Sequence, residues 1–73
     1  MSRLPSLKPR EVVAILKKNQ FVEIRQSGSH LVLRDSKGHE VVVPMHSREL
    51  KRSTLLSIVQ QAGYTADSFR KLL

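Results

Sequence analysis

Cysteine is absent from this chain of 73 residues. Disulfide bonds, a thiolate nucleophile and a thiolate zinc site are therefore excluded, and a cytoplasmic location is expected. Long hydrophobic runs are missing as well. The longest, residues 12–16 and 41–43, fall far short of the ~20 residues that cross a bilayer, so we expect no membrane association. Residues 1–5 contain no apolar segment, and we expect no secretory signal there.

Acidic residues are also few, since six Asp and Glu face thirteen Lys and Arg, for a formal net charge of +7. The basic residues are spread along the chain and form no basic tail. A folded basic domain most often binds a polyanion, and nucleic acid is the commonest one; an acidic protein partner is the alternative. Only three aromatic residues are present. Their scarcity argues against recognition of single strands by stacking and favours recognition of RNA by shape and backbone.

The sequence shows no pattern typical of a metal or cofactor site. The acidic residues have no metal-ligand spacing, and no two of the three histidines lie four residues apart on an expected helix. The three glycines are each explained by a turn or a helix end, so no glycine-rich phosphate loop is present. We therefore expect neither a metal nor a cofactor.

The spacing of apolar residues predicts two main helices and one short helix. We expect the first over residues 7–18, with Ser6 as its N-cap and an apolar stripe at helical spacing. The second begins near Ser53 and ends at Gly63, a natural C-terminal stop. Thr65 can cap a last short helix, whose inward-facing residues are expected to be Phe69, Leu72 and Leu73.

Between the helices the pattern alternates with period two and predicts three strands, over residues 21–26, 30–34 and 40–43. The connecting turns are short, so the strands are antiparallel neighbours. The inward side chains of the first two strands are expected to be Val22, Ile24, Leu31 and Leu33. The same alternation puts the outward side chains on the opposite face, and these are Glu23, Arg25, His30 and Arg34. A single bulge would reverse this assignment.

The sheet thus has one apolar face, and each main helix has one apolar stripe. The simplest packing puts both main helices on the same face of the sheet. We expect one α+β domain over residues 1–73, built as a helix, a three-stranded antiparallel sheet, a helix and a short C-terminal helix. The other face of the sheet is left open.

His30 is the most interesting candidate for chemistry because it follows a Gly28-Ser29 turn at the start of a strand. An imidazole can give or take a proton near neutral pH. RNA offers a matching reaction, in which the 2′-hydroxyl attacks the adjacent phosphorus while neighbouring cations stabilise the phosphate charge. Taken alone, however, an isolated strand histidine is more often an ordinary polar residue.

Other residues are weaker candidates. His46 lies in a basic loop and could touch phosphate, whereas His39 beside a turn is interpreted as solvent-exposed decoration. The spacing of the residues does not indicate a catalytic triad of Ser29 with a histidine and an acid. The Ser29 hydroxyl or backbone N–H could still position a phosphate. Arg25 and Lys37 are candidate contacts to backbone phosphates.

Three segments of the chain resemble the HicA toxins of bacterial and archaeal toxin–antitoxin pairs, also described as the YcfA-like family. They are KPREVV at residues 8–13 with Phe21, RQSGSH at residues 25–30, and VPMH at residues 43–46 followed by ELKRSTLLSI at residues 49–58. The Gly-Ser-His signature alone is weak, but the three segments occur in the family's order and spacing. Many members have glycine where this chain has Ser53, and a polar or aromatic residue where it has Leu31.

The resemblance implies a fold like that of a double-stranded-RNA-binding domain. It implies a toxin that cleaves messenger RNA without a metal, and it assigns the catalytic role to His30. It also implies a HicB antitoxin as partner, which covers the active site. The RNA-binding residues expected beside His30 are Gly28, Ser29, Arg25, Lys37 and His46. Because Leu31 is apolar, His30 has no obvious neighbouring helper.

Two other hypotheses remain open. One is a non-catalytic RNA-binding module with the same fold and charge, which would bind RNA in a salt-sensitive way and form no product. The other is a protein-interaction domain whose basic face meets an acidic partner.

Overall fold

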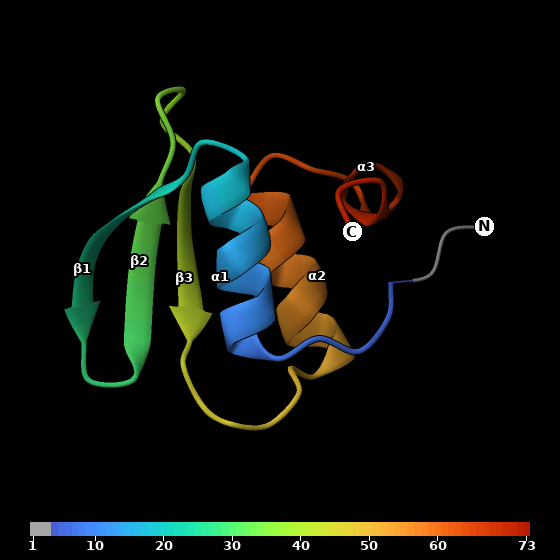
Figure 1. Ribbon diagram of the computed structural model, residues 1–73, viewed down its shortest axis with the longest axis horizontal. Helices are drawn as coiled ribbons and strands as arrows, with labels where there is room; N and C mark the ends of the chain where they lie inside the picture. The colour runs from blue at the N-terminus through green and yellow to red at the C-terminus, as the bar shows by residue number, and fades with distance from the viewer. Residues whose placement is uncertain (1–3) are drawn as a thin grey trace.

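Six elements follow one another in the order that the sequence predicts. The computed structural model describes residues 4–73, and its elements are α1 (Pro9–Lys18), β1 (Val22–Ser27), β2 (His30–Arg34), β3 (Glu40–Pro44), α2 (Arg52–Gln61) and α3 (Ala66–Arg70) (Figure 1). The α+β fold with a three-stranded antiparallel sheet is therefore confirmed, as is its likeness to a double-stranded-RNA-binding domain. No helix within residues 4–73 is long and apolar enough to span a membrane.

The first helix starts later than expected. Its N-cap is Lys8, so the predictions of Ser6 as N-cap and of a helix from residue 7 were wrong. Pro9 takes the first helical position, where its missing N–H is not needed. The carboxylate of Glu11 accepts a hydrogen bond from the Lys8 backbone N–H at 2.7 Å. These two residues together set the start of α1, because one fixes the backbone and the other satisfies a free donor.

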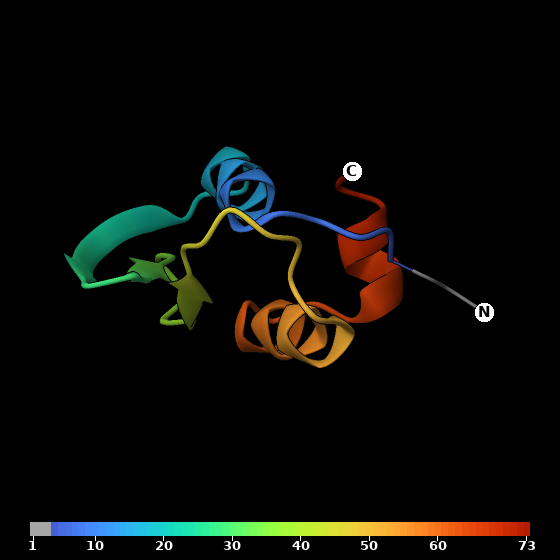
Figure 2. The ribbon, with the colours of Figure 1, turned by 90° about the horizontal axis from the view of Figure 1, so that it is seen from below.

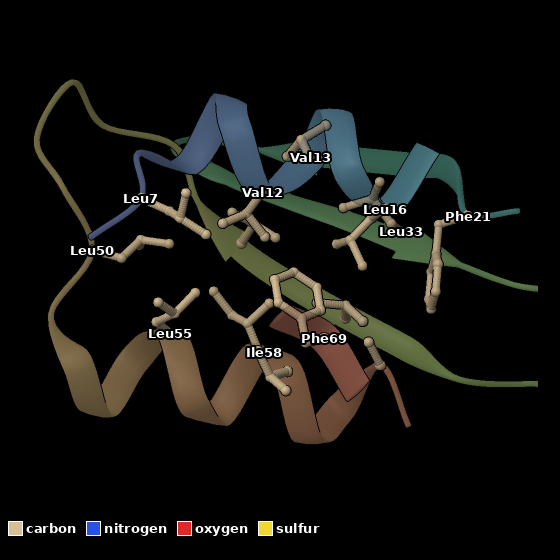
Figure 3. Packing of buried hydrophobic residues seen from close by; sticks show 14 of the residues in the cluster. Leu7, Val12, Val13, Leu16, Phe21, Leu33, Leu50, Leu55, Ile58 and Phe69 are labelled. Atoms are coloured by element: carbon tan, nitrogen blue, oxygen red, sulfur yellow. The ribbon is translucent and has the colours of Figure 1, made fainter. Parts of the chain in front are cut away.

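The sheet has the order β1-β2-β3, with both pairs antiparallel. Both main helices lie on one side of it, with α1 and α2 packing against β3, as Figure 2 shows end-on. The core fills the space between the two helices and the inner face of the sheet (Figure 3). It draws its fully buried side chains from every element except β1, among them Leu16, Leu33, Val41, Ile58 and Phe69. The sheet therefore has one covered face and one open face.

The first strand departs from the predicted alternation. Val22 and Ile24 are 59% and 42% exposed, so the expectation that they point inward was wrong. The pairing register shifts between Glu23 and Arg25, which is the signature of a bulge at Ile24. Glu23 pairs with Leu33 of the covered face and forms an ion pair with Lys17 of α1. The bulge thus moves Glu23 to the helix side and Val22 to the open side.

The segments outside the main elements close the core at its edges. Leu4 and Leu7 are buried, and their carbonyl groups accept hydrogen bonds from the Arg52 side chain at 2.6 Å and from the Leu50 N–H at 2.8 Å. The predicted cap of α3 is confirmed, since the Thr65 hydroxyl accepts from the Ser68 N–H at 3.0 Å. Phe69 is fully buried as expected. The last residue, Leu73, is 51% exposed because it lies beyond the end of the helix, so that prediction was wrong.

Candidate functional site

The turn between β1 and β2 presents the Gly-Ser-His signature. Gly28 has a positive φ of 58°, and a Cβ added there would meet nothing within 4 Å. Glycine therefore suits this position because of its backbone conformation and not for lack of space. His30 is the first residue of β2 and pairs with Ser27 on one side and Pro44 on the other. The ladder on both sides holds the His30 backbone in place.

The turn is joined to the loop that follows β3. The backbone N–H of Met45 donates to the carbonyl of Ser29. His46 is the next residue in the chain, and Arg48 follows in the same loop. The turn, this loop and the first turns of α1 and α2 all lie at the lower end of the molecule in Figure 1. The structure therefore gathers His30, His46 and several basic residues at one end.

The His30 side chain is exposed and lies on the open face of the sheet. Leu31 and Leu33 point into the core, so His30 points the opposite way with Val32 and Arg34. Val32 is nevertheless buried, whereas His30 and Arg34 at the two ends of the strand are exposed. No hydrogen bond or ion pair to the His30 imidazole is present within residues 4–73. The ring is thus accessible to a large ligand, but no side chain of the described region orients it.

Arg25 is the cation nearest to His30 along the open face. It pairs with Val32, while His30 pairs with Ser27, so Arg25 and His30 are diagonal neighbours on adjacent strands. Such neighbours are about 7–8 Å apart, a distance that an arginine side chain can span. Arg34 lies farther along β2 and forms an ion pair with Glu40 at 2.6 Å. Arg25 is therefore available to a phosphate at His30, while Arg34 is already engaged.

The positive charge of Arg25 also affects the pKa of Glu40, which lies on β3. The hydrogen bond from Arg34 lowers the pKa of the Glu40 carboxyl, and the charges of Arg34 and Arg25 lower it further. Glu40 itself is exposed, so solvent screens these interactions. The open face thus carries a net positive charge around a carboxylate that stays ionised.

Lys37 does not join this group. It lies in the turn between β2 and β3, whereas His30 is at the opposite end of β2. Five strand residues span about 17 Å, so a single phosphate cannot contact both side chains. Of the residues predicted beside His30, the structure brings together Gly28, Ser29, Arg25 and the loop of His46, and it leaves Lys37 apart.

The His39 side chain is 40% exposed, as predicted, but it also has a structural partner. Its Nδ1 lies 2.7 Å from the carboxylate of Asp35, and the same carboxylate accepts the backbone N–H groups of Lys37 and His39. The ring also packs over Gly63. An aspartate four residues before a histidine across a glycine turn is a signal that could have found this pair. Within residues 4–73, no group of three or more His, Cys, Asp or Glu side chains could hold a metal ion.

Comparison with known proteins points to one family. A family model described as the HicA toxin of bacterial toxin–antitoxin matches residues 9–64. The match runs from the start of α1 to just past the end of α2, so it contains the whole sheet and the Gly28-Ser29-His30 turn. The comparison with curated proteins returned no match.

Proposed function

We propose that this chain, which belongs to the HicA toxin family of bacterial toxin–antitoxin systems, is an endoribonuclease that cleaves messenger RNA with His30 as its catalytic acid or base. Family membership gives the toxin role. The ribonuclease activity, the role of His30 and the antitoxin partner are our proposals. We also propose that residues 1–73 act as one domain and that the activity takes place in the cytoplasm.

The proposed reaction needs only proton transfer and charge stabilisation. The 2′-oxygen of one nucleotide forms a bond to the adjacent phosphorus, and the bond from phosphorus to the 5′-oxygen of the next nucleotide breaks. His30 either takes the proton of the 2′-hydroxyl or gives a proton to the leaving 5′-oxygen. Arg25 stabilises the negative charge that builds up on the phosphate oxygens, and the Gly28-Ser29 backbone and the Ser29 hydroxyl help to position the phosphate.

The observation that carries this proposal is the exposure of His30 at a well-supported position. Its backbone is held by β1 and β3, and its side chain faces solvent beside Arg25. The basic loop with His46 is fastened to the same turn through the hydrogen bond from Met45 to Ser29. An RNA strand could therefore contact the imidazole and several cations at once.

The test is a time course of labelled RNA with purified protein in buffer containing EDTA. We expect wild-type protein to cleave and His30→Ala to lose about 100-fold or more of the rate, the usual contribution of an acid–base group. The His30 side chain makes no contact that supports the core, so the variant should unfold at the wild-type temperature. A folded His30→Ala variant that cuts at the wild-type rate would show that the assignment is wrong.

One observation favours the alternative of a non-catalytic RNA-binding module. Catalytic histidines are commonly oriented by a second group, and no hydrogen-bonding partner for the His30 imidazole is found in the described part of the chain. This alternative predicts RNA binding that weakens with salt, with no product formed in the same time course. Wild-type protein that binds RNA tightly without cleaving it would favour this alternative over the nuclease.

We further propose that a HicB antitoxin binds the open face of the sheet and blocks His30. Val22, Ile24 and Val42 are the large apolar residues exposed on the sheet, and Arg25 lies among them. A mixture of apolar and positively charged side chains fits an acidic protein partner. A HicB-like reading frame beside this gene, whose product protects RNA when added to the toxin, is the expected result.

A further inference from the structure

A cavity lies at the end of the molecule opposite to His30. It has a volume of about 330 Å³, and we call it the hairpin pocket because the turn between β2 and β3 forms one wall. The C-terminal ends of α1 and α2 form the other walls, at the upper end of Figure 1. Its lining includes Lys18, Asn19, Gln20, Lys37, His39 and Tyr64. The volume is within the range of small-molecule sites.

Gln20 stands at the rim in an unfavourable backbone conformation. It is the only non-glycine residue with a positive φ among residues 4–73, at 76°. The N–H of Phe21 donates to the carbonyl of Leu16 across it, so Gln20 occupies the position after a helix where glycine is usual. Glycine would form the same turn without strain. Non-glycine residues in this conformation cluster at ligand-binding and active sites, which makes the Gln20 side chain a candidate ligand contact.

The His39 ring is held rigidly in the pocket wall. Asp35 fixes one edge of the ring through Nδ1, and Gly63 lies against the other. A Cβ on Gly63 would come within 2.6 Å of His39 Nε2, so the close approach depends on glycine. Burial raises the pKa of the Asp35 carboxyl, but the hydrogen bonds and charge of His39 outweigh this and hold the pKa below its ordinary value. The His39 ring is therefore fixed in the pocket wall before any ligand binds, and the Asp35 carboxylate that holds it is ionised.

Two lysines flank the opening. Lys18 ends α1 and Lys37 lies in the hairpin turn, and both are exposed. Neither ammonium group forms a hydrogen bond or an ion pair with any residue that the structure describes. Together they provide two cations on one rim, which suits a phosphate group.

The wall next to the lysines offers both hydrogen-bond acceptors and donors. The Asn19 side chain donates its Nδ2 to the Ile15 carbonyl at 2.8 Å, which leaves its oxygen free to accept. The Gln20 amide has no partner within residues 4–73, and its oxygen can accept too. Each amide also keeps an N–H donor, so the wall can pair with an amino group or a carbonyl oxygen of a base. The Tyr64 ring adds an aromatic surface.

We propose that the hairpin pocket binds one nucleotide of an RNA strand, with the base against Tyr64 and the Asn19 and Gln20 amides and the phosphate at Lys18 and Lys37. The inference rests on the proposed action on RNA and extends it. Because β2 separates the pocket from His30 by about 17 Å, the bound nucleotide lies several positions away from the cleaved bond. The pocket thus positions the strand and takes no part in proton transfer.

The first test uses the four nucleoside 5′-monophosphates and the amide NMR signals of the folded wild-type protein. We expect the signals of Gln20, Lys37 and Tyr64 to shift in a saturable way with the nucleotides. Inorganic phosphate should not reproduce the shifts. Equal shifts with inorganic phosphate, or none with any nucleotide, would overturn the proposal. Nucleotide monophosphates contain no bond that the enzyme cleaves, so this result does not depend on the nuclease activity.

Variants separate the pocket from the rest of the basic surface. Lys18→Gln combined with Lys37→Gln should weaken nucleotide binding about tenfold or more, the effect of losing charge-assisted hydrogen bonds. Lys71→Gln is the matched control, since that lysine is exposed and lies outside the pocket. Gln20→Gly should bind nucleotide more weakly although it relieves the strained backbone. A Gln20→Gly protein with unchanged binding would contradict the proposal.

The second test distinguishes a nucleotide within RNA from a free nucleotide. Folded His30→Ala protein is titrated with a single-stranded oligoribonucleotide too long to fit within the pocket alone. We expect shifts both at the pocket and at the Gly28-Ser29 turn, and weaker binding when the two pocket lysines are replaced. Pocket signals that respond to free nucleotides but not to the oligoribonucleotide would show a site for free nucleotides instead, and the proposal would be wrong. Loss of cleavage in any variant is a separate result, and it bears on the nuclease proposal alone.

Discussion

Gly63 and Gly38 have nearly the same backbone conformation but different surroundings. Their φ angles are 88° and 94°, and only Gly63 has a side chain, that of His39, where a Cβ would be placed. We expect Gly38→Ala to lower the free energy of unfolding by about 1 kcal/mol, through the positive φ alone. Gly63→Ala should lower it by about 2–3 kcal/mol, because the His39 ring must also move. Urea denaturation measures both, and equal losses would show that the contact with His39 contributes nothing.

The lowered pKa values of Asp35 and Glu40 predict how the stability of the fold depends on pH. Both carboxyls have a pKa below the ordinary value in the folded protein, Asp35 through His39 and Glu40 through Arg34. Their stabilising effect is therefore present at neutral pH, begins to fall near the ordinary carboxyl pKa of about 4, and is lost below the lowered pKa. We expect the melting temperature to fall over this acidic range.

Two variants and a control check this dependence on pH. Asp35→Asn and Glu40→Gln should each make the melting temperature less sensitive to acid, because each removes one of the linked carboxyls. Glu49→Gln serves as the control, as that exposed carboxylate has no hydrogen-bond partner among residues 4–73. If all three variants follow the wild-type profile, these two carboxyls do not set the acid sensitivity.

Among the elements, β1 is the strand in which the alternation of apolar and polar residues fails to predict which side chains are buried. In β2 the period-two pattern correctly puts Leu31 and Leu33 in the core, although Val32 of the opposite face is buried as well. In β1 the bulge at Ile24 shifts the pattern, and the strand lies at the edge of the sheet beyond the helices. Val22 and Glu23 therefore exchange faces. A bulge leaves no mark in the spacing of apolar residues, so the sequence could not reveal it.

The same contrast predicts different effects of one substitution. Val22→Thr, on an exposed strand, should change the free energy of unfolding by less than about 0.5 kcal/mol. Val41→Thr, at a fully buried position of β3, should lower it by about 1–3 kcal/mol, because a hydroxyl is buried without a partner. Urea denaturation of the two variants measures the difference. Similar losses would mean that β1 contributes to the core after all.

The candidate site was only partly predictable from the sequence. The Gly28-Ser29-His30 motif identified the turn, and the alternation of β2 correctly put His30 on the open face. The hydrogen bond from Met45 to Ser29 depends on the path of a loop, which has no periodicity to read. Likewise, the hairpin pocket is formed by three chain reversals that are far apart in the sequence. Such contacts depend on packing, and no local pattern encodes them.

The positive charge of the whole molecule predicts a strong dependence of RNA binding on salt. With a net charge of +7, the affinity of His30→Ala protein for single-stranded RNA should fall steadily as salt rises. In a plot of log affinity against log salt, Arg25→Gln should reduce the slope by about 0.7, the value for one lost phosphate contact. Fluorescence anisotropy gives the slope, and Lys71→Gln is the control for loss of a surface charge. An unchanged slope for Arg25→Gln would remove Arg25 from the RNA contacts.

The way the core is closed has a consequence for synthesis of the protein on the ribosome. Leu4 and Leu7, which are made before the rest of the core, are held by Leu50 and Arg52, and Phe69 completes the same core. A nascent chain that has made only α1 and the sheet therefore lacks the surfaces that bury these early residues. Because domains fold as units, the fold can form only when almost all of these residues have emerged. The turn that carries His30 is thus assembled late, and a translation product cut short before Phe69 should not fold into an active toxin.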